Sequence, residues 1–148
     1  MSFNTLRPQI VTLIDSISGI HEVVGYPKLK FAGYPAAYIT PSDNSNDYET
    51  TQENIRTYAF LLRIFYETKN TGVSNALDKL ENIVDTVIDT LDQEDLKGAS
   101  DRTIGVSLPS GYTFLNILAH PSSWGEIVGE ELIYAEIKVQ VRISIDIT

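Results

Sequence analysis

The carboxyl-terminal segment 131–147 alternates polar and apolar residues almost without a break, and this pattern constrains the fold more than any other feature. A period of two is that of an extended strand, whose successive side chains point to opposite faces. At about 3.4 Å per residue the strand would be roughly 55 Å long, whereas most strands have about 5 or 6 residues. We therefore expect a strand that extends beyond its own domain and serves assembly. Its apolar set is Ile133, Ala135, Ile137, Val139, Val141, Ile143, Ile145 and Ile147.

The opposite face of this strand is polar, with Tyr134, Glu136, Lys138, Gln140, Arg142, Ser144 and Asp146. A long strand with a wet face and free margins offers unpaired backbone groups to a neighbouring chain. We therefore predict a subunit interface or a lumen at four of these residues, namely Glu136, Lys138, Gln140 and Arg142.

Length and composition limit the classes of protein to consider. The 148 residues predict one domain, 1–148, with a core of its own. A net charge of −9 argues against phosphate contacts as the main source of binding energy for nucleic acid. The lack of cysteine excludes disulfides, thiolate metal sites and a cysteine nucleophile. Because no apolar stretch could cross a bilayer and residues 1–7 lack the core of a signal peptide, we expect folding in the cytoplasm and no membrane partner.

Two helices and several strands precede the terminal strand. Apolar residues recur at helical spacing in 6–17 and 73–91, and the second of these segments carries an acidic stripe on its other side. That stripe consists of Asp78, Glu81, Asp85, Asp89 and Asp92. Charged residues opposite an apolar stripe are typical of any surface helix, so the stripe alone does not predict a metal or partner site.

The strands are predicted at 20–24, 36–40, 55–68, 112–120 and 131–147, with a turn at 121–129. Antiparallel pairing is expected between 36–40 and 55–67, and between 112–120 and 131–147. The predicted fold is α+β: a four- to five-stranded, mostly antiparallel sheet with two amphipathic helices packed on one face. The other face is expected to stay half polar and accessible.

A stretch without basic residues, 41–54, carries four acidic residues and little that could be buried. It predicts a long solvated loop that becomes ordered when a partner binds. Asp43, Asp47, Tyr48 and Glu49 are its expected contact residues. Deletion of 43–52 is expected to leave the fold intact and to abolish partner binding.

The sequence contains no phosphate-binding or dinucleotide-binding glycine motif and no Gly-x-Ser-x-Gly elbow. His120 lies near Ser122 and Ser123, but residues two apart on a strand rarely face each other, and a triad is recognised by geometry. Two histidines cannot supply a zinc motif. The calcium-like spacing of 43–47 fails because Tyr48 occupies the glycine position and Asn54 the glutamate position. No catalytic, cofactor-binding or metal-binding residue is therefore predicted.

Trp124, the single tryptophan, lies in the predicted turn among serines and a glycine. It is either an aromatic anchor for a partner or a cover over the domain's own core.

The order and spacing of these elements resemble the tail terminator, or tail completion, proteins of long-tailed bacteriophages. The matching elements span about residues 6 to 147. They are the amino-terminal helix, Gly33-Tyr-Pro-Ala-Ala-Tyr-Ile-Thr-Pro41, the acidic stretch, Arg56-Thr-Tyr-Ala-Phe-Leu-Leu-Arg-Ile-Phe-Tyr66, Val73-Ser-Asn-Ala-Leu-Asp-Lys-Leu-Glu81 and the terminal strand. The segment 98–111 is long for this pattern.

The resemblance implies a non-enzymatic virion protein that forms a ring, typically of six subunits, at the head–tail junction. Such a ring caps the head-proximal end of the tail tube, stops its polymerisation and docks the neck or head-completion protein. Its partners would be further copies of itself, the major tail tube protein and the neck, with genomic DNA passing through the lumen without specific binding. Asp43, Asp47, Tyr48 and Glu49 would then contact an adjacent ring.

Two alternatives stay open at the level of sequence. One is another connector or head-closure ring of the same neck, which would share small α+β subunits and acidic loops. The other, from a different class, is a small ligand-binding or hydrolytic α+β domain that uses His120 and the adjoining turn. A ligand-binding domain or an enzyme would be a monomer or dimer and would lose function on His120→Ala.

Overall fold

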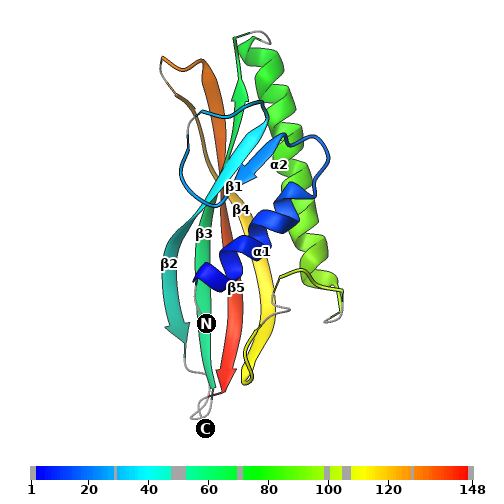
Figure 1. Cartoon of the computed structure of the whole chain (residues 1–148), viewed down its shortest axis with the longest axis vertical. Coiled ribbons are helices and arrows are strands. Elements are labelled where there is room, and N and C mark those ends of the chain that lie inside the picture. The colour runs from blue at the N-terminus through cyan, green and yellow to red at the C-terminus, as the bar shows by residue number, and fades with distance from the viewer. Residues whose placement is uncertain are drawn as a thin grey trace.

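The computed structural model describes residues 3–28, 30–47, 53–69, 72–98, 101–104, 108–127 and 129–146. In chain order the elements are α1 (Phe3–Asp15), β1 (Glu22–Val24), β2 (Ala36–Asp47), β3 (Glu53–Glu67), α2 (Val73–Leu96), β4 (Tyr112–Ile127) and β5 (Leu132–Asp146) (Figure 1). The strands form one sheet in the order β1-β2-β3-β5-β4. The short β1 is parallel to β2, and the other pairs are antiparallel. The α+β class is therefore confirmed.

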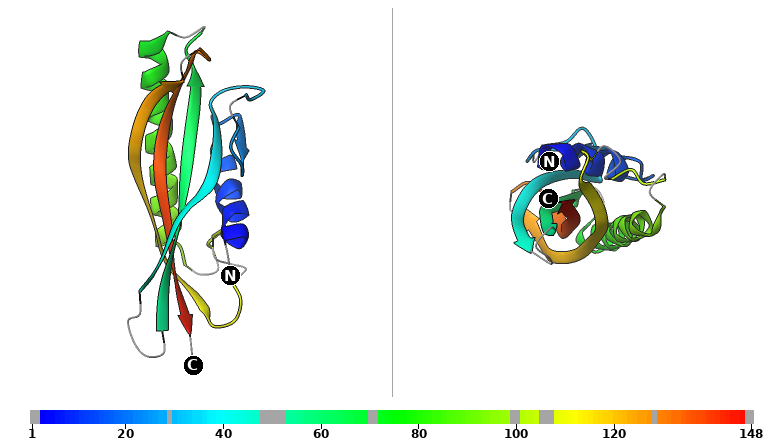
Figure 2. Two further views of the ribbon diagram at one scale, coloured as in Figure 1. Left: turned by 90° about the vertical axis from the view of Figure 1, so that its left-hand side faces the viewer. Right: turned by 90° about the horizontal axis from the view of Figure 1, so that it is seen from below.

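Both helices form where the apolar spacing places them, and both bury most of the predicted stripe, although Val73 and Leu77 of α2 are exposed. Leu6, Ile10 and Ile14 of α1 are fully buried, as are Leu80 and Leu91 of α2. The acidic residues of α2 from Asp78 to Asp92 are exposed. The two helices lie beside a long, twisted sheet whose strands extend past them at the end where both termini lie (Figure 2).

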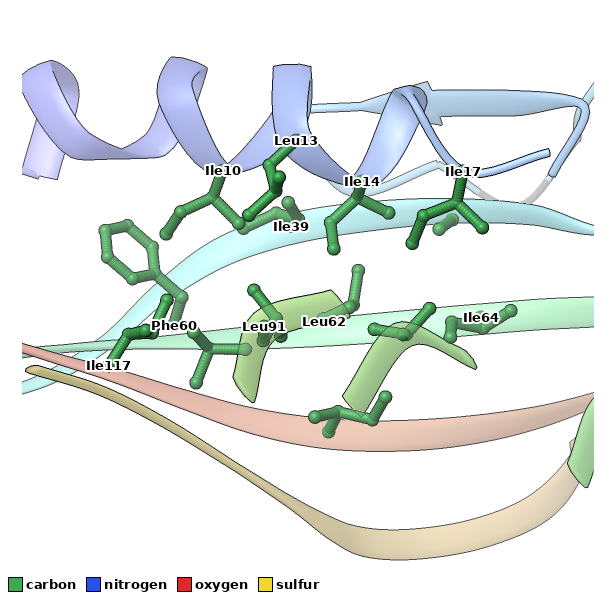
Figure 3. Close-up of a cluster of buried hydrophobic side chains, with 14 of the residues drawn as sticks. Ile10, Leu13, Ile14, Ile17, Ile39, Phe60, Leu62, Ile64, Leu91 and Ile117 are labelled. Atoms are coloured by element: carbon green, nitrogen blue, oxygen red, sulfur yellow. The ribbon is translucent and has the colours of Figure 1, made fainter. Parts of the chain in front are cut away.

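The core lies between the helices and one face of the sheet. Register places Phe60, Leu62 and Ile64 of β3 opposite Val139, Ile137 and Ala135 of β5, so these side chains share a face. Side chains from both helices meet this face and form a single apolar cluster (Figure 3). At about 25 cal/mol per Å² of apolar surface, burial of this face supplies most of the driving force for folding.

Two strands are longer than the sequence pattern predicts. β2 continues through Pro41 to Asp47, and β4 continues through Pro121 to Ile127, so a strand replaces the predicted turn at 121–127. Each proline lies at a register shift. Pro41 lies on β2 beyond the residues that pair with β1, and Pro121 lies on β4, which is an edge strand. Proline cannot donate a ladder hydrogen bond, but an edge position or a bulge tolerates it.

The terminal strand also differs from the expectation in its place. β5 lies between β3 and β4 and pairs with both along almost its whole length. The expectation that its margins are free is wrong, because the two long neighbours satisfy its backbone groups. Only its polar face is left to meet another molecule.

Candidate assembly surfaces

The sheet has one face without a helix, which we call the open face. Its central row is the polar set of β5, and register places Arg63 beside Glu136 and Leu61 beside Lys138. The four predicted residues, Glu136, Lys138, Gln140 and Arg142, are therefore brought together on one face, all partly exposed.

At one end of the open face, the side chains interact with one another. Arg63 Nε donates to Glu136 Oε2 at 2.7 Å, and Arg63 Nη1 donates to Tyr38 Oη at 3.2 Å. The guanidinium also lies 5.0 Å from the ring centroid of Tyr134. Phe31 and Phe65 pack into the same aromatic group, with ring centroids 5.8 Å apart. Glu136 thus has a partner within its own sheet.

The remaining part of the open face is different, because its two cations have no acidic residue opposite them in the register. Lys138 is opposite Leu61 on β3 and His120 on β4, and Arg142 is opposite Thr57 and Asn116. Cross-strand neighbours are the pairs through which side chains on a sheet stabilise one another. Neither cation has a carboxylate opposite it in the register. Leu118, opposite Gln140, is a large apolar side chain that remains 42% exposed on this face.

The other side of the molecule presents α2 and a groove. Leu77, Glu81 and Asp85 of α2 and Trp124 of β4 line a hollow of about 480 Å³. Trp124 pairs with Ala135 in the register, which places it on the helix-covered face, yet it is 44% exposed. A ring that is partly covered on this face and partly exposed is compatible with both roles left open for Trp124, so its role as a partner anchor stays a prediction. The groove combines an exposed aromatic ring with two carboxylates.

The carboxyl end of α2 holds the edge of the sheet, a feature that sequence reasoning missed. Asp95 Oδ1 accepts a hydrogen bond from the backbone N–H of Ile117 on β4 at 2.8 Å. The buried Glu94 carboxylate accepts from the backbone N–H groups of Thr103 and Ile104, and Lys97 Nζ lies 3.1 Å from it. The signal was present in the sequence, since Glu94 continues the apolar stripe three residues after Leu91.

The predicted loop 41–54 is wrong in part, because 41–47 belong to β2 and 53–54 to β3. Asn44 to Asp47 pair with Tyr58 to Ile55. The polar residues of this stretch carry no apolar pattern that would predict a strand, and the pairing of the backbone with β3 depends on residues elsewhere in the sequence. Asp43 and Asp47 lie on β2, whereas Tyr48 and Glu49 lie outside the described residues. Deletion of 43–52 would thus remove paired strand and no longer isolates a loop.

The histidines do not form a site with the nearby serines. His120 is exposed and opposite Lys138, while the Ser122 hydroxyl donates to the backbone oxygen of Glu136 at 3.3 Å. His21 packs against Gly33, where a Cβ would lie 2.7 Å from the imidazole ring. Among the residues that the structure describes, no group of three or more His, Asp or Glu side chains is placed to hold a metal ion. Neither α1 nor α2, over their described lengths, is long and apolar enough to cross a bilayer.

Comparison with known proteins identifies the fold but no sequence relative. No protein-family model and no curated protein sequence matches the chain. Among solved structures, a chain from the virion of a native gene transfer agent particle superposes with a TM-score of 0.60 and 12% sequence identity. The match covers 97% of this chain and 99% of that one. The two chains therefore share one fold along nearly their whole length.

Proposed function

We propose that this protein is a structural component of a phage-like virion, and that its role is that of the tail terminator. In this role it forms a ring at the head–tail junction, ends polymerisation of the tail tube and docks the neck. The observation that carries the proposal is the end-to-end match in fold with a virion chain of a gene transfer agent. The order of elements, which resembles the tail terminator family over residues 6 to 147, supports the finer role.

The surfaces of the molecule fit a ring subunit. In a closed ring each subunit uses two different surfaces, which satisfy each other around the circle. The open face and the α2 side are two such surfaces, and they lie on opposite sides of the sheet. Six copies of a 16.5 kDa chain would form a ring of about 100 kDa. An acidic chain also repels DNA phosphates, so the genome would pass the lumen without adhering.

Contacts with adjacent rings would come from the end of the sheet that extends beyond the helices. The residues proposed for them are Asp43 and Asp47 on β2, together with Tyr48 and Glu49. The double variant Asp43→Asn, Asp47→Asn keeps side-chain size and removes charge. It should weaken binding to tail tubes with no change in the melting temperature. Asp15→Asn, Asp101→Asn, at two exposed residues outside the proposed surfaces, is the matched control for charge.

Electron microscopy of negatively stained samples tests the role. The purified protein is imaged alone and with polymerising major tail tube protein of the same particle. The expected result is a ring on one end of each tube and shorter tubes as the protein concentration rises. Tubes of unchanged length without a cap would refute the terminator role. A ring that binds head or neck protein but never a tube would favour the connector alternative instead.

A further inference from the structure

We propose that the groove on the α2 side of one copy receives the open face of the next copy. This inference rests on the proposed function, because it names the interface from which the ring is built. The acceptor surface consists of Leu77, Glu81, Asp85 and Trp124. The donor surface consists of Lys138, Arg142 and the exposed Leu118.

Charge complementarity identifies the occupant as a second copy of this chain. The groove has two carboxylates, and α2 continues the negative stripe with Asp78, Asp89 and Asp92. On the open face, neither Lys138 nor Arg142 has an acidic cross-strand neighbour on either side. Arg63 has Glu136 as its partner and needs no other. The open face of one chain therefore has the cations that the groove of another lacks.

Apolar contact adds to the ionic contact. Trp124 and Leu77 are 44% and 39% exposed in the groove, and Leu118 is 42% exposed on the open face. Large exposed side chains of this kind are the usual anchors of a protein interface, with charged groups around them. A cation that enters the groove can also lie over the Trp124 ring, an arrangement that Arg63 and Tyr134 already form within the chain.

The placement of the two surfaces makes the contact head-to-tail. Trp124 and α2 lie on the helix-covered side of the sheet, and Lys138 lies on the other side. One chain therefore cannot join its own surfaces, and a contact of groove to open face repeats from copy to copy. Such a repeat closes into a ring when the rotation per copy allows it.

Cross-linking tests the contact directly, because the chain has no native cysteine. A single chain carrying Asp85→Cys and Gln140→Cys is treated with a short bismaleimide at increasing protein concentration. The sheet separates these positions within one chain, so links should form between copies and give a ladder that ends at a closed ring. Absence of linked species at the highest concentration would overturn the proposal. A control with Asp85→Cys and Lys30→Cys, of which Lys30 is exposed but outside the donor surface, should give no ladder.

Charge reversal provides the second test, with sedimentation velocity as the measurement. Lys138→Glu with Arg142→Glu makes both surfaces negative, and Glu81→Lys with Asp85→Lys makes both positive. Each variant alone should associate about 10-fold or more weakly than the wild type, since like charges then meet. An equimolar mixture should associate again, as should a chain with all four substitutions. The control Lys30→Glu, Lys69→Glu changes net charge as the first variant does and should associate normally. Wild-type behaviour of both reversals, or failure of the mixture, would overturn the proposal.

The outcome for the interface is separable from that for the proposed function. Tubes capped by a protein that gives no 85–140 link would reject the interface and retain the terminator role. A ladder from a protein that never caps a tube would retain the interface and reject that role. The fluorescence of Trp124, the single tryptophan, supplies an independent signal: its emission should shift to shorter wavelength on association. Circular dichroism confirms that each variant is folded.

Discussion

The two faces of β5 differ in what they contribute, although they belong to the same fifteen residues. On one face, Ile137, Val139 and Val141 are fully buried under the helices. On the other, Lys138 and Arg142 are partly exposed and have no acidic cross-strand neighbour. The first face stabilises the chain, and the second is left for association. A strand with strict alternation can therefore specify folding and assembly at once, because substitutions on one face leave the other in place.

Truncation of a side chain of β5 should strongly lower the free energy of unfolding on the buried face and barely change it on the open face. Ile137→Ala removes buried atoms and leaves a cavity, which should lower the free energy of unfolding by about 2–5 kcal/mol. Gln140→Ala, three residues away on the open face, should change it by less than about 0.5 kcal/mol. Urea denaturation followed by circular dichroism measures both. Equal losses would mean that the open face also stabilises the monomer.

A second comparison separates buried from exposed carboxylates at the end of α2. Glu94→Ala leaves the backbone N–H groups of Thr103 and Ile104 without their acceptor, which should cost about 1–3 kcal/mol. Asp92→Ala, exposed on the same turn of the helix, should have an effect within about 0.5 kcal/mol. Thermal and urea unfolding report the difference. An unchanged free energy of unfolding in Glu94→Ala would mean that this carboxylate does not stabilise the 101–104 segment.

A third, smaller contrast lies within the open face, between the Arg63–Glu136 ion pair and the cations Lys138 and Arg142, which have no acidic residue opposite them. The double-mutant cycle of Arg63→Ala and Glu136→Ala should give a coupling energy of about 1 kcal/mol, because the pair is partly shielded and charge-assisted. Urea denaturation of the four proteins of the cycle measures this term. A coupling near zero would place Glu136 with the residues available to a neighbour.

Substitution of the two cations of the open face should hardly change the stability of the chain but should strongly weaken self-association. Lys138→Ala and Arg142→Ala should each change unfolding by less than about 0.5 kcal/mol. Together they should weaken self-association and reduce its dependence on salt, since exposed charges are screened as ionic strength rises. Sedimentation velocity at low and high salt is the measurement. Loss of stability without loss of association would reverse the roles of the two faces.

Most of the fold could be predicted from periodicity, and so could two of the four strand pairings, those of 36–40 with 55–67 and of 112–120 with 131–147. The pairings of β1 with β2 and of β3 with β5 could not. The alternation in 131–147 predicted which side chains are buried, because successive residues of a strand point to opposite faces and the helices cover only one of these faces. It did not reveal that β5 is an interior strand, since strand order depends on contacts distant in sequence. The apolar spacing of α1 and α2 placed both helices correctly.

The errors arose where a local signal competes with strand pairing. The predicted strands 36–40 and 112–120 end just before Pro41 and Pro121, whereas the structure continues both strands because edge positions and register shifts accommodate proline. The polar residues 42–47 gave no burial signal because the ladder to β3 holds them. Of the candidate surfaces, the polar row of β5 could be predicted. The groove at Trp124 could not, since it forms only when β4 and α2 come together.

In the proposed assembly, the open face of each subunit is covered by a neighbouring copy. Amine labelling of Lys138, followed by mass spectrometry, measures this coverage in the dilute protein and in the isolated ring. Lys30 and Lys69, both exposed and outside the proposed surfaces, serve as internal references. We expect Lys138 to react in the dilute protein and to be protected in the ring, while the two references react equally in both. Equal labelling of Lys138 in the two states would contradict the account.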